Sequence, residues 1–105
     1  MKHFSLLIPL LFVSVIVSAQ VSRGTVKESL TLDSKILGKQ VKYTIYLPFD
    51  YETSERYYPV TYLLHGLGDN DMGWLQFGEV NMIADQGIAN RDFPSMIIAM
   101  PDGGV

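Results

Sequence analysis

The amino-acid sequence predicts an α/β fold in which an antiparallel hairpin is followed by a βαβ unit. Three patterns predict it. Apolar and polar residues alternate over residues 41–47, two short continuous apolar runs occupy residues 60–64 and 96–100, and residues 80–88 have helical spacing. Alternation indicates a half-buried strand, whereas short apolar runs separated by a helix are typical of buried parallel strands.

The first nineteen residues have the pattern of a secretory signal peptide. A basic residue, Lys2, precedes an almost wholly apolar stretch at residues 6–17, and small residues end at Ala19. This stretch is shorter than the roughly 20 apolar residues of a membrane span. We therefore expect residues 1–19 to be a signal peptide, the mature protein to be secreted or periplasmic, and no membrane attachment to remain after cleavage.

The composition excludes several classes of function. The chain has 105 residues, with Lys+Arg 8, Asp+Glu 11, a net charge of −3 and no cysteine. The negative charge gives no electrostatic basis for binding nucleic acid, so we expect no nucleic-acid partner. The absence of cysteine excludes disulfides, thiolate metal ligands and a cysteine nucleophile.

The first part of the expected mature chain reads as a loop followed by a strand. Residues 20–26 carry little apolar pattern and are predicted to form a leading loop. From Lys27 the apolar residues fall on even positions, which predicts a strand with one buried face. These positions are Leu30, Leu32 and Ile36. Gly38 and Lys39 can then turn the chain, because glycine tolerates a positive φ.

The clearest strand is predicted over residues 41–47. It ends at Pro48, which lacks a backbone donor. Its buried face is expected to consist of Val41, Tyr43, Ile45 and Leu47. With the preceding strand it would form an antiparallel hairpin, and the aperiodic residues 49–58 would form a loop.

Residues 60–64 and 96–100 are each expected to be strands buried on both faces. After a loop at residues 69–74, a helix is predicted between them. Its apolar face comprises Val80, Ile83, Ala84 and Ile88, with Glu79, Asp85 and Gln86 outside it. The order of strand, glycine loop, helix and strand describes a right-handed βαβ unit with parallel strands.

The last apolar run is closed by Pro101, and the sequence ends at Val105. A lone βαβ unit leaves one face of its sheet uncovered. We therefore expect residues 27–105 to be the amino-terminal part of a larger domain that is incomplete at the C-terminus.

The sequence His65-Gly66-Leu67-Gly68 directly follows the first of these buried strands. A buried strand that ends in His-Gly-x-Gly resembles the oxyanion loop of α/β-hydrolases. With the hairpin before it and Ile-Ile-Ala-Met-Pro-Asp-Gly-Gly after it, the chain resembles the family called putative esterases. That family holds esterase D-like hydrolases, feruloyl and acetylxylan esterases and mycobacterial mycolyltransferases. The resemblance covers roughly residues 27–104, about the first third of such a domain.

The resemblance implies a role for each residue of this loop. Leu67 would offer its backbone N–H to the oxyanion of the tetrahedral intermediate, and Gly66 and Gly68 would permit the turn. His65 would fix the loop without acting as a base. Independently of the resemblance, Trp74 is an aromatic residue after a loop, and it would either line an acyl or sugar pocket or cover the core. The alternative is a tight strand-to-helix turn without chemistry, because glycine-rich turns of this kind are common in α/β folds.

The family's catalytic residues are missing from these 105 residues. No Gly-x-Ser-x-Gly nucleophile motif occurs, and His65 is the sole histidine after the predicted signal peptide. A Ser-His-Asp triad therefore cannot be assembled from this chain. We expect a fragment of a secreted serine carboxylic-ester hydrolase, acting in its full-length form on acyl or feruloyl esters of polysaccharides and inactive alone.

Two alternatives stay open. The chain could be a non-catalytic secreted binding module, which fits the absence of every triad member. The full protein could also be an acyltransferase that hands its acyl group to a sugar instead of water. The full-length protein is expected to take a small-molecule or carbohydrate ester as its substrate, and no cofactor is implied.

Two further motifs are incomplete, because residues at required positions do not match. The glycine loop begins like a dinucleotide-binding fingerprint, but Asp71 stands where the third glycine belongs. A calcium loop that starts at Asp69 would have Gly73 and Val80 at two of its ligand positions. We therefore expect solvated loop acids and no bound metal.

Overall fold

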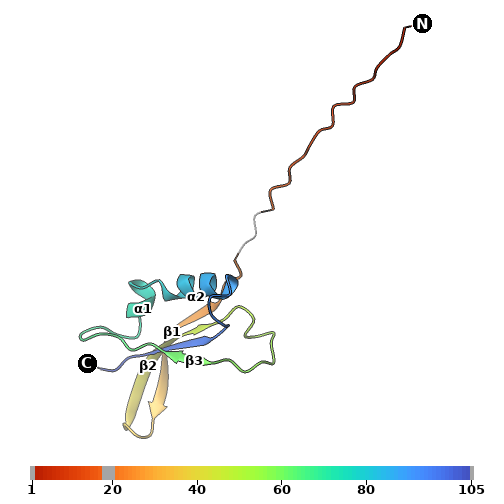
Figure 1. The fold of residues 1–105 in the computed structure, drawn as a ribbon. Coiled ribbons are helices and arrows are strands. Elements are labelled where there is room, and N and C mark those ends of the chain that lie inside the picture. Colours follow the sequence, from red (N-terminus) through yellow and green to blue (C-terminus); the bar gives the residue numbers. More distant parts are fainter. Residues whose placement is uncertain (1, 18–20, 105) are drawn as a thin grey trace.

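Four strands form one mixed sheet, and two helices lie on one side of it (Figure 1). The computed structural model describes residues 2–17 and 21–104. The elements in chain order are β1 (Thr25–Ser34), β2 (Lys39–Leu47), β3 (Val60–Tyr62), α1 (Gly73–Gln76), α2 (Val80–Ala89) and β4 (Ile97–Pro101). The strand order is β1-β2-β4-β3, with β3 parallel to β4 and the other pairs antiparallel. The hairpin and the βαβ unit with parallel strands are both confirmed.

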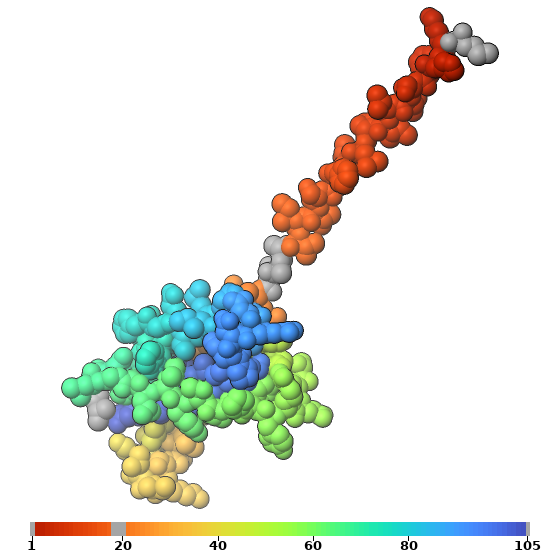
Figure 2. Space-filling view, viewed as in Figure 1, coloured from red at the N-terminus to blue at the C-terminus, as the bar shows by residue number. Residues whose placement is uncertain are grey.

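The amino-terminal segment stands apart from the sheet. Residues 2–17 form no helix or strand, and they extend away from the folded part of the chain with exposed side chains (Figures 1 and 2). The predicted cleavage point after Ala19 lies outside the described residues. Within residues 2–17 and 21–104, no helix is long and apolar enough to cross a membrane.

The hairpin turns where the sequence predicts, with Gly38 at a φ of 64°. Its first strand is longer than predicted, because β1 begins at Thr25, inside the expected leading loop. The predicted buried face of β1 was wrong, since Leu32 is 59% and Ile36 97% exposed. Val26 pairs with Tyr46, but after a register shift between Lys27 and Leu30 the even-numbered Leu30 and Leu32 pair with Tyr43 and Val41, on the face opposite the helices.

The turn of the hairpin projects from the body of the molecule, on the side away from α2 (Figure 2). Ile36 lies in this turn, between β1 and β2. No described element covers it there, which is why its side chain is exposed despite its place in the apolar pattern.

The fully buried face of β2 is the one that the alternation did not predict. Thr44 and Tyr46 are 0% and 1% exposed, whereas Tyr43 and Ile45 on the other face are only half-buried. The helices cover the face that bears Tyr46, and no described helix covers the opposite face. Leu47, at the end of the strand, is buried as predicted.

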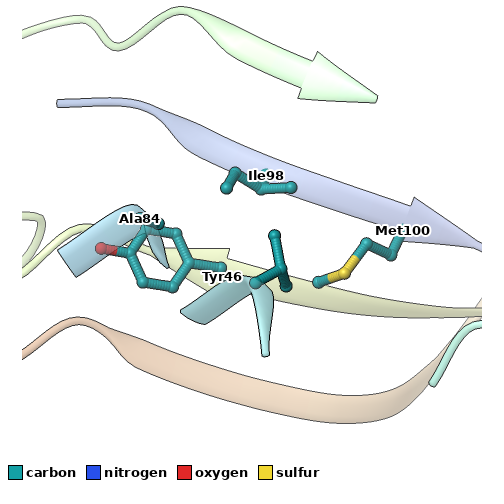
Figure 3. Packing of buried hydrophobic residues seen from close by; sticks show 5 residues of the cluster. Tyr46, Ala84, Ile98 and Met100 are labelled. Carbon is teal, nitrogen blue, oxygen red and sulfur yellow. The ribbon is translucent and has the colours of Figure 1, made fainter. Parts of the chain in front are cut away.

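The core lies between α2 and the two central strands. Its buried members are Tyr46, Val80, Ala84, Ile98 and Met100 (Figure 3). The Tyr46 hydroxyl donates to Asp85 Oδ1 at 2.7 Å, so a ring that is otherwise apolar in its contacts has its polar end satisfied. Burial, followed by this hydrogen bond, raises the pKa of Tyr46 well above its ordinary value.

The predicted helix is present as α2, but its faces differ from the prediction. Ile83 is 60% exposed, and Asp85 lies against the hairpin, not outside the packed face. Its carboxylate also accepts the Gly24 N–H at 2.8 Å. Gly87 lies within the helix. A side chain at this position would overlap the ring of Phe93, so the packing requires glycine.

The two apolar runs form unequal strands. β4 is central, with Ile98 and Met100 buried, and it extends through Pro101. β3 has three residues at the edge of the sheet, and Val60 and Tyr62 are 45% and 69% exposed. The prediction that both strands are buried on both faces was therefore wrong for the described residues. The helix layer covers one face only, and β3 has a single neighbouring strand.

Candidate functional site

The loop predicted to bind an oxyanion leaves the sheet at the carboxyl end of β3. The Leu63 N–H donates to the Ala99 carbonyl at 2.9 Å, so the chain stays paired with β4 just beyond the strand. A turn follows in which the Asp69 N–H donates to the Gly66 carbonyl at 3.2 Å. Gly68 has a φ of 78°, which a residue with a side chain rarely adopts. The turn therefore depends on glycine at this position.

His65 joins the start of this loop to the segment after β4. Its side chain is 3% exposed, and its Nε2 accepts the Gly103 N–H at 2.9 Å. Because a backbone N–H can only donate, Nε2 carries no proton in this arrangement. The proton lies on Nδ1, 2.7 Å from the Gly66 carbonyl, to which it can donate. The ring is neutral and holds two segments together, with Asp102 Oδ1 3.5 Å from Nε2.

The backbone donors at the tip of the loop are free. Among the residues that the structure describes, the N–H groups of Gly66, Leu67 and Gly68 have no hydrogen-bond partner. The Leu67 side chain is 93% exposed, and a Cβ at Gly66 would meet no atom within 4 Å. Unpaired backbone N–H groups are the kind of donor from which an oxyanion hole is built.

Trp74 lies on α1, the short helix that the sequence did not predict. Its indole N–H donates to the Leu64 carbonyl at 3.0 Å, which ties α1 to the chain before the oxyanion loop. The side chain is 42% exposed and lines a cavity of about 320 Å³ together with His65, Gly66 and Phe77. Trp74 thus combines a structural hydrogen bond with a surface open to a ligand.

Asp71 is buried, contrary to the prediction that the loop acids are solvated. It is 4% exposed, and its Oδ2 accepts the hydroxyls of Thr44 and Ser29 at 2.8 and 3.0 Å. Both hydroxyls belong to the hairpin. No group of three or more His, Cys, Asp or Glu side chains with the arrangement of a metal site occurs within residues 2–17 and 21–104.

Comparison with known proteins identifies the family. Residues 34–105 match the family described as putative esterases. The chain belongs to this family. A curated endo-1,4-beta-xylanase/feruloyl esterase from Xylanibacter ruminicola is 31% identical over 87 residues, which is 79% of this chain and 12% of that protein.

Solved structures of ferulic acid esterases share this fold. A ferulic acid esterase is 36% identical, with a TM-score of 0.72, and the match covers 76% of this chain and 31% of the esterase. The ferulic acid esterase of Anaeromyces mucronatus is 30% identical, with a TM-score of 0.68, and the match covers 81% of this chain and 32% of the esterase. The fold is therefore that of part of an α/β-hydrolase, as predicted, and the chain spans about a third of these esterases.

Within this putative-esterase fold, the structure brings His65, Gly66 and Trp74 together around one cavity. Leu67 lies in the same loop and is exposed to solvent. The residue that sequence reasoning missed is Asp71, together with its hydroxyl partners in the hairpin. No local pattern marks these partners, because they lie 27 and 42 positions away along the chain.

Proposed function

We propose that this chain supplies the oxyanion loop of a secreted serine carboxylic-ester hydrolase. The observation that carries the proposal is the pair of free N–H groups at Leu67 and Gly68, presented at the carboxyl end of β3. Ester hydrolysis passes through a tetrahedral intermediate whose oxygen carries a negative charge. Fixed backbone donors stabilise that charge, and losing one donor in a comparable site lowers kcat by about 10²–10³.

The catalytic groups have to come from outside these residues. No Gly-x-Ser-x-Gly motif occurs in the sequence, and both ring nitrogens of His65 are engaged in the loop. A histidine that accepts through Nε2 and donates through Nδ1 has no free nitrogen with which to activate a serine. The 105-residue chain is therefore expected to show no ester turnover on its own.

The proposed substrates are acyl or feruloyl esters of polysaccharides. The support is the kinship with proteins named feruloyl or ferulic acid esterases, one of them joined to an endo-1,4-beta-xylanase. The cavity beside the oxyanion loop, with Trp74 and Phe77 in its wall, suits an aromatic or sugar ligand. No metal or cofactor is part of this proposal.

Export belongs to the same proposal. It is supported by Lys2 and the apolar residues 6–17, which have the composition of a signal peptide. Amino-terminal sequencing of the exported protein tests it. A mature chain that begins at Gln20 is expected, whereas an exported or cytoplasmic protein that retains Lys2 would contradict it.

The decisive test is a chimera. Residues 21–105 replace the matching part of the Anaeromyces mucronatus ferulic acid esterase, and methyl ferulate hydrolysis is measured. We expect an active chimera in which Leu67→Pro, which removes the N–H, lowers kcat by about 10²–10³. Leu67→Ala keeps the N–H and is expected to retain most of the activity.

Two results would overturn the proposal. The first is an active chimera whose kcat is unchanged by Leu67→Pro, which would place the oxyanion hole elsewhere. The second is hydrolysis of a nitrophenyl ester by the 105-residue chain alone that is lost in Leu67→Pro. An inactive chimera that still binds a feruloylated polysaccharide would favour the non-catalytic binding module.

A further inference from the structure

We infer that Asp71 is a positioning residue. It anchors the residues that directly follow His65–Gly68, and so the far end of the oxyanion loop, to the β1–β2 hairpin. This inference rests on the proposed function of the loop. The anchor consists of Asp71 in the loop and of Thr44 and Ser29 in the hairpin. It lies outside the family's catalytic triad, and it contributes through the geometry of Leu67 without contacting substrate.

The contacts of the anchor are buried and charge-assisted. Asp71 is 4% exposed and Thr44 is 0% exposed. Oδ2 of Asp71 accepts the Thr44 hydroxyl at 2.8 Å and the Ser29 hydroxyl at 3.0 Å. Hydrogen bonds to an ionised carboxylate are roughly twice as strong as neutral ones, and burial removes water as a competitor.

The hairpin is shaped to present these hydroxyls. Ser29 has a φ of 46°, in the left-handed region that residues with side chains seldom occupy, and it lies at the register shift of β1. Its N–H donates to Thr44 Oγ1 at 3.1 Å, which leaves the Thr44 proton free to bind Asp71. Such strain persists only where the surrounding contacts over-determine the conformation. The bulge therefore directs two donors at one carboxylate oxygen.

The loop is consequently held at both ends. His65 fixes its beginning through Gly103, and Asp71 fixes its end, immediately before α1. α1 in turn bears Trp74, whose indole N–H binds the Leu64 carbonyl. The free N–H groups of Leu67 and Gly68 lie between these two fixed points. If the Asp71 anchor is lost, Leu67 is expected to become mobile while the sheet stays intact.

The test is ¹⁵N NMR relaxation on the full 105-residue chain. Asp71→Asn keeps an acceptor oxygen but removes its charge, so we expect weaker bonds from Thr44 and Ser29 and order parameters of Leu67 and Gly68 that fall from about 0.85 toward about 0.6. Exchange of the Trp74 indole N–H with solvent is expected to become at least about tenfold faster, because weakening a hydrogen bond to the Asp71 carboxylate makes opening of the loop more favourable by about that factor. Amides of β2 and β4 are expected to be unchanged. Asp33→Asn, an exposed carboxylate on the same hairpin, is the matched control and is expected to have no effect.

A second set of variants covers the case in which Asp71→Asn fails to fold. Thr44→Val keeps the shape of the side chain but removes the hydroxyl, whereas Thr44→Ser restores a hydroxyl. Loop mobility is expected to rise in Thr44→Val and to be normal in Thr44→Ser. Ser29→Ala is expected to have an intermediate effect, because it removes one of the two donors.

Equal order parameters for Leu67 in wild type and Asp71→Asn would overturn the inference, and so would identical behaviour of Thr44→Val and Thr44→Ser. These readouts do not depend on hydrolysis. Failure of the esterase chimera would therefore leave the anchor standing. A chimera that needs the Leu67 N–H, combined with a loop indifferent to Asp71→Asn, would remove the anchor and leave the proposed function standing.

Discussion

Both ring nitrogens of His65 are engaged in hydrogen bonds, so neither is free to act as a base. Nε2 accepts from Gly103 and Nδ1 lies within hydrogen-bond distance of the Gly66 carbonyl. Protonation of Nε2 would place a donor against the Gly103 N–H, so the neutral ring is the form that fits. His65 is thus a link between the oxyanion loop and the segment that follows β4.

Replacing His65 tests this link. His65→Ala leaves the Gly103 N–H without its partner, and we expect the free energy of unfolding to fall by about 1–3 kcal/mol. Urea denaturation followed by the fluorescence of Trp74, the single tryptophan, measures it. His3→Ala is the control, because His3 is exposed in the amino-terminal segment. Equal midpoints for the two variants would show that the link contributes nothing to stability.

Tyr46 gives the fold a defined pH dependence. Burial, and then the bond to Asp85, raises its pKa in the folded state above the unfolded value of about 10. Below about pH 10 the tyrosine is protonated in both states, so its contribution to stability is fully present there. Above that pH the unfolded state ionises first, and stability is lost as the pH rises toward the folded pKa.

We therefore expect Tyr46→Phe to lower stability at pH 8 by about 1 kcal/mol, the value of one hydrogen bond, but to lose less stability than wild type between pH 9 and 11. Urea midpoints across this range measure the difference. Tyr57→Phe is the matched control, since Tyr57 is fully exposed, and it should keep the wild-type slope. A Tyr46→Phe slope equal to that of Tyr57→Phe would contradict the assignment.

At the scale of elements, α2 shows how packing overrides helical periodicity. Glycine is a poor helix former, yet Gly87 lies inside α2 because the Phe93 ring occupies the space of a side chain. The helix can therefore lie close to the segment that leads into β4. On the same helix Ala84 packs into the core against the sheet, whereas Ile83 lies on a flank that no described element covers.

Gly87→Ala is accordingly expected to destabilise the chain by about 1–3 kcal/mol through overpacking, despite the better helix propensity of alanine. Thermal or urea unfolding measures the change. In the double variant with Phe93→Leu the loss should be smaller, because the smaller side chain gives way. Gly66→Ala meets no neighbouring atom and should leave stability nearly unchanged. A stabilised Gly87→Ala would show that the Phe93 contact is not formed.

The hairpin shows that the alternation of apolar residues predicts strands but not which of their faces is buried. Its strands, its turn and the end of β2 could be predicted, because alternation, glycine and proline act locally. The buried face could not, since the register shift in β1 and the position of the helices decide it. Ser29, at that shift, also forms half of the Asp71 anchor.

Across the whole molecule, one face of the sheet carries apolar side chains without a helix above them in the described residues. Tyr62 and Leu64 are 69% and 71% exposed, and Tyr43 and Ile45 are half-buried. Exposed apolar surfaces of this kind mark places where other protein surfaces bind. In the related esterases this chain corresponds to about a third of the length.

We expect residues 21–105 to bind a hydrophobic dye and to self-associate as their concentration rises. Tyr62→Glu with Leu64→Glu should lower both, because a charged face neither takes up the dye nor packs against a second copy. Dye fluorescence and sedimentation measure the two effects. The measurement uses residues 21–105, without the exposed apolar segment 2–17. Thr31→Glu with Gln40→Glu is the control, because both are exposed polar residues of the hairpin. A monomer that binds no dye would contradict the open face.

The sequence by itself determined the class of fold, the hairpin, the parallel βαβ unit and the position of the glycine loop. These follow from short-range chemistry: alternation, apolar runs, helical spacing, and the backbone freedom of Gly38 and Gly68. Only the tertiary structure decided which face of β2 is buried, that β4 lies between β2 and β3, and that Asp71 is an anchor and not a solvated acid. Those features depend on contacts between residues far apart in the sequence, and no local pattern records which distant group will meet a given side chain.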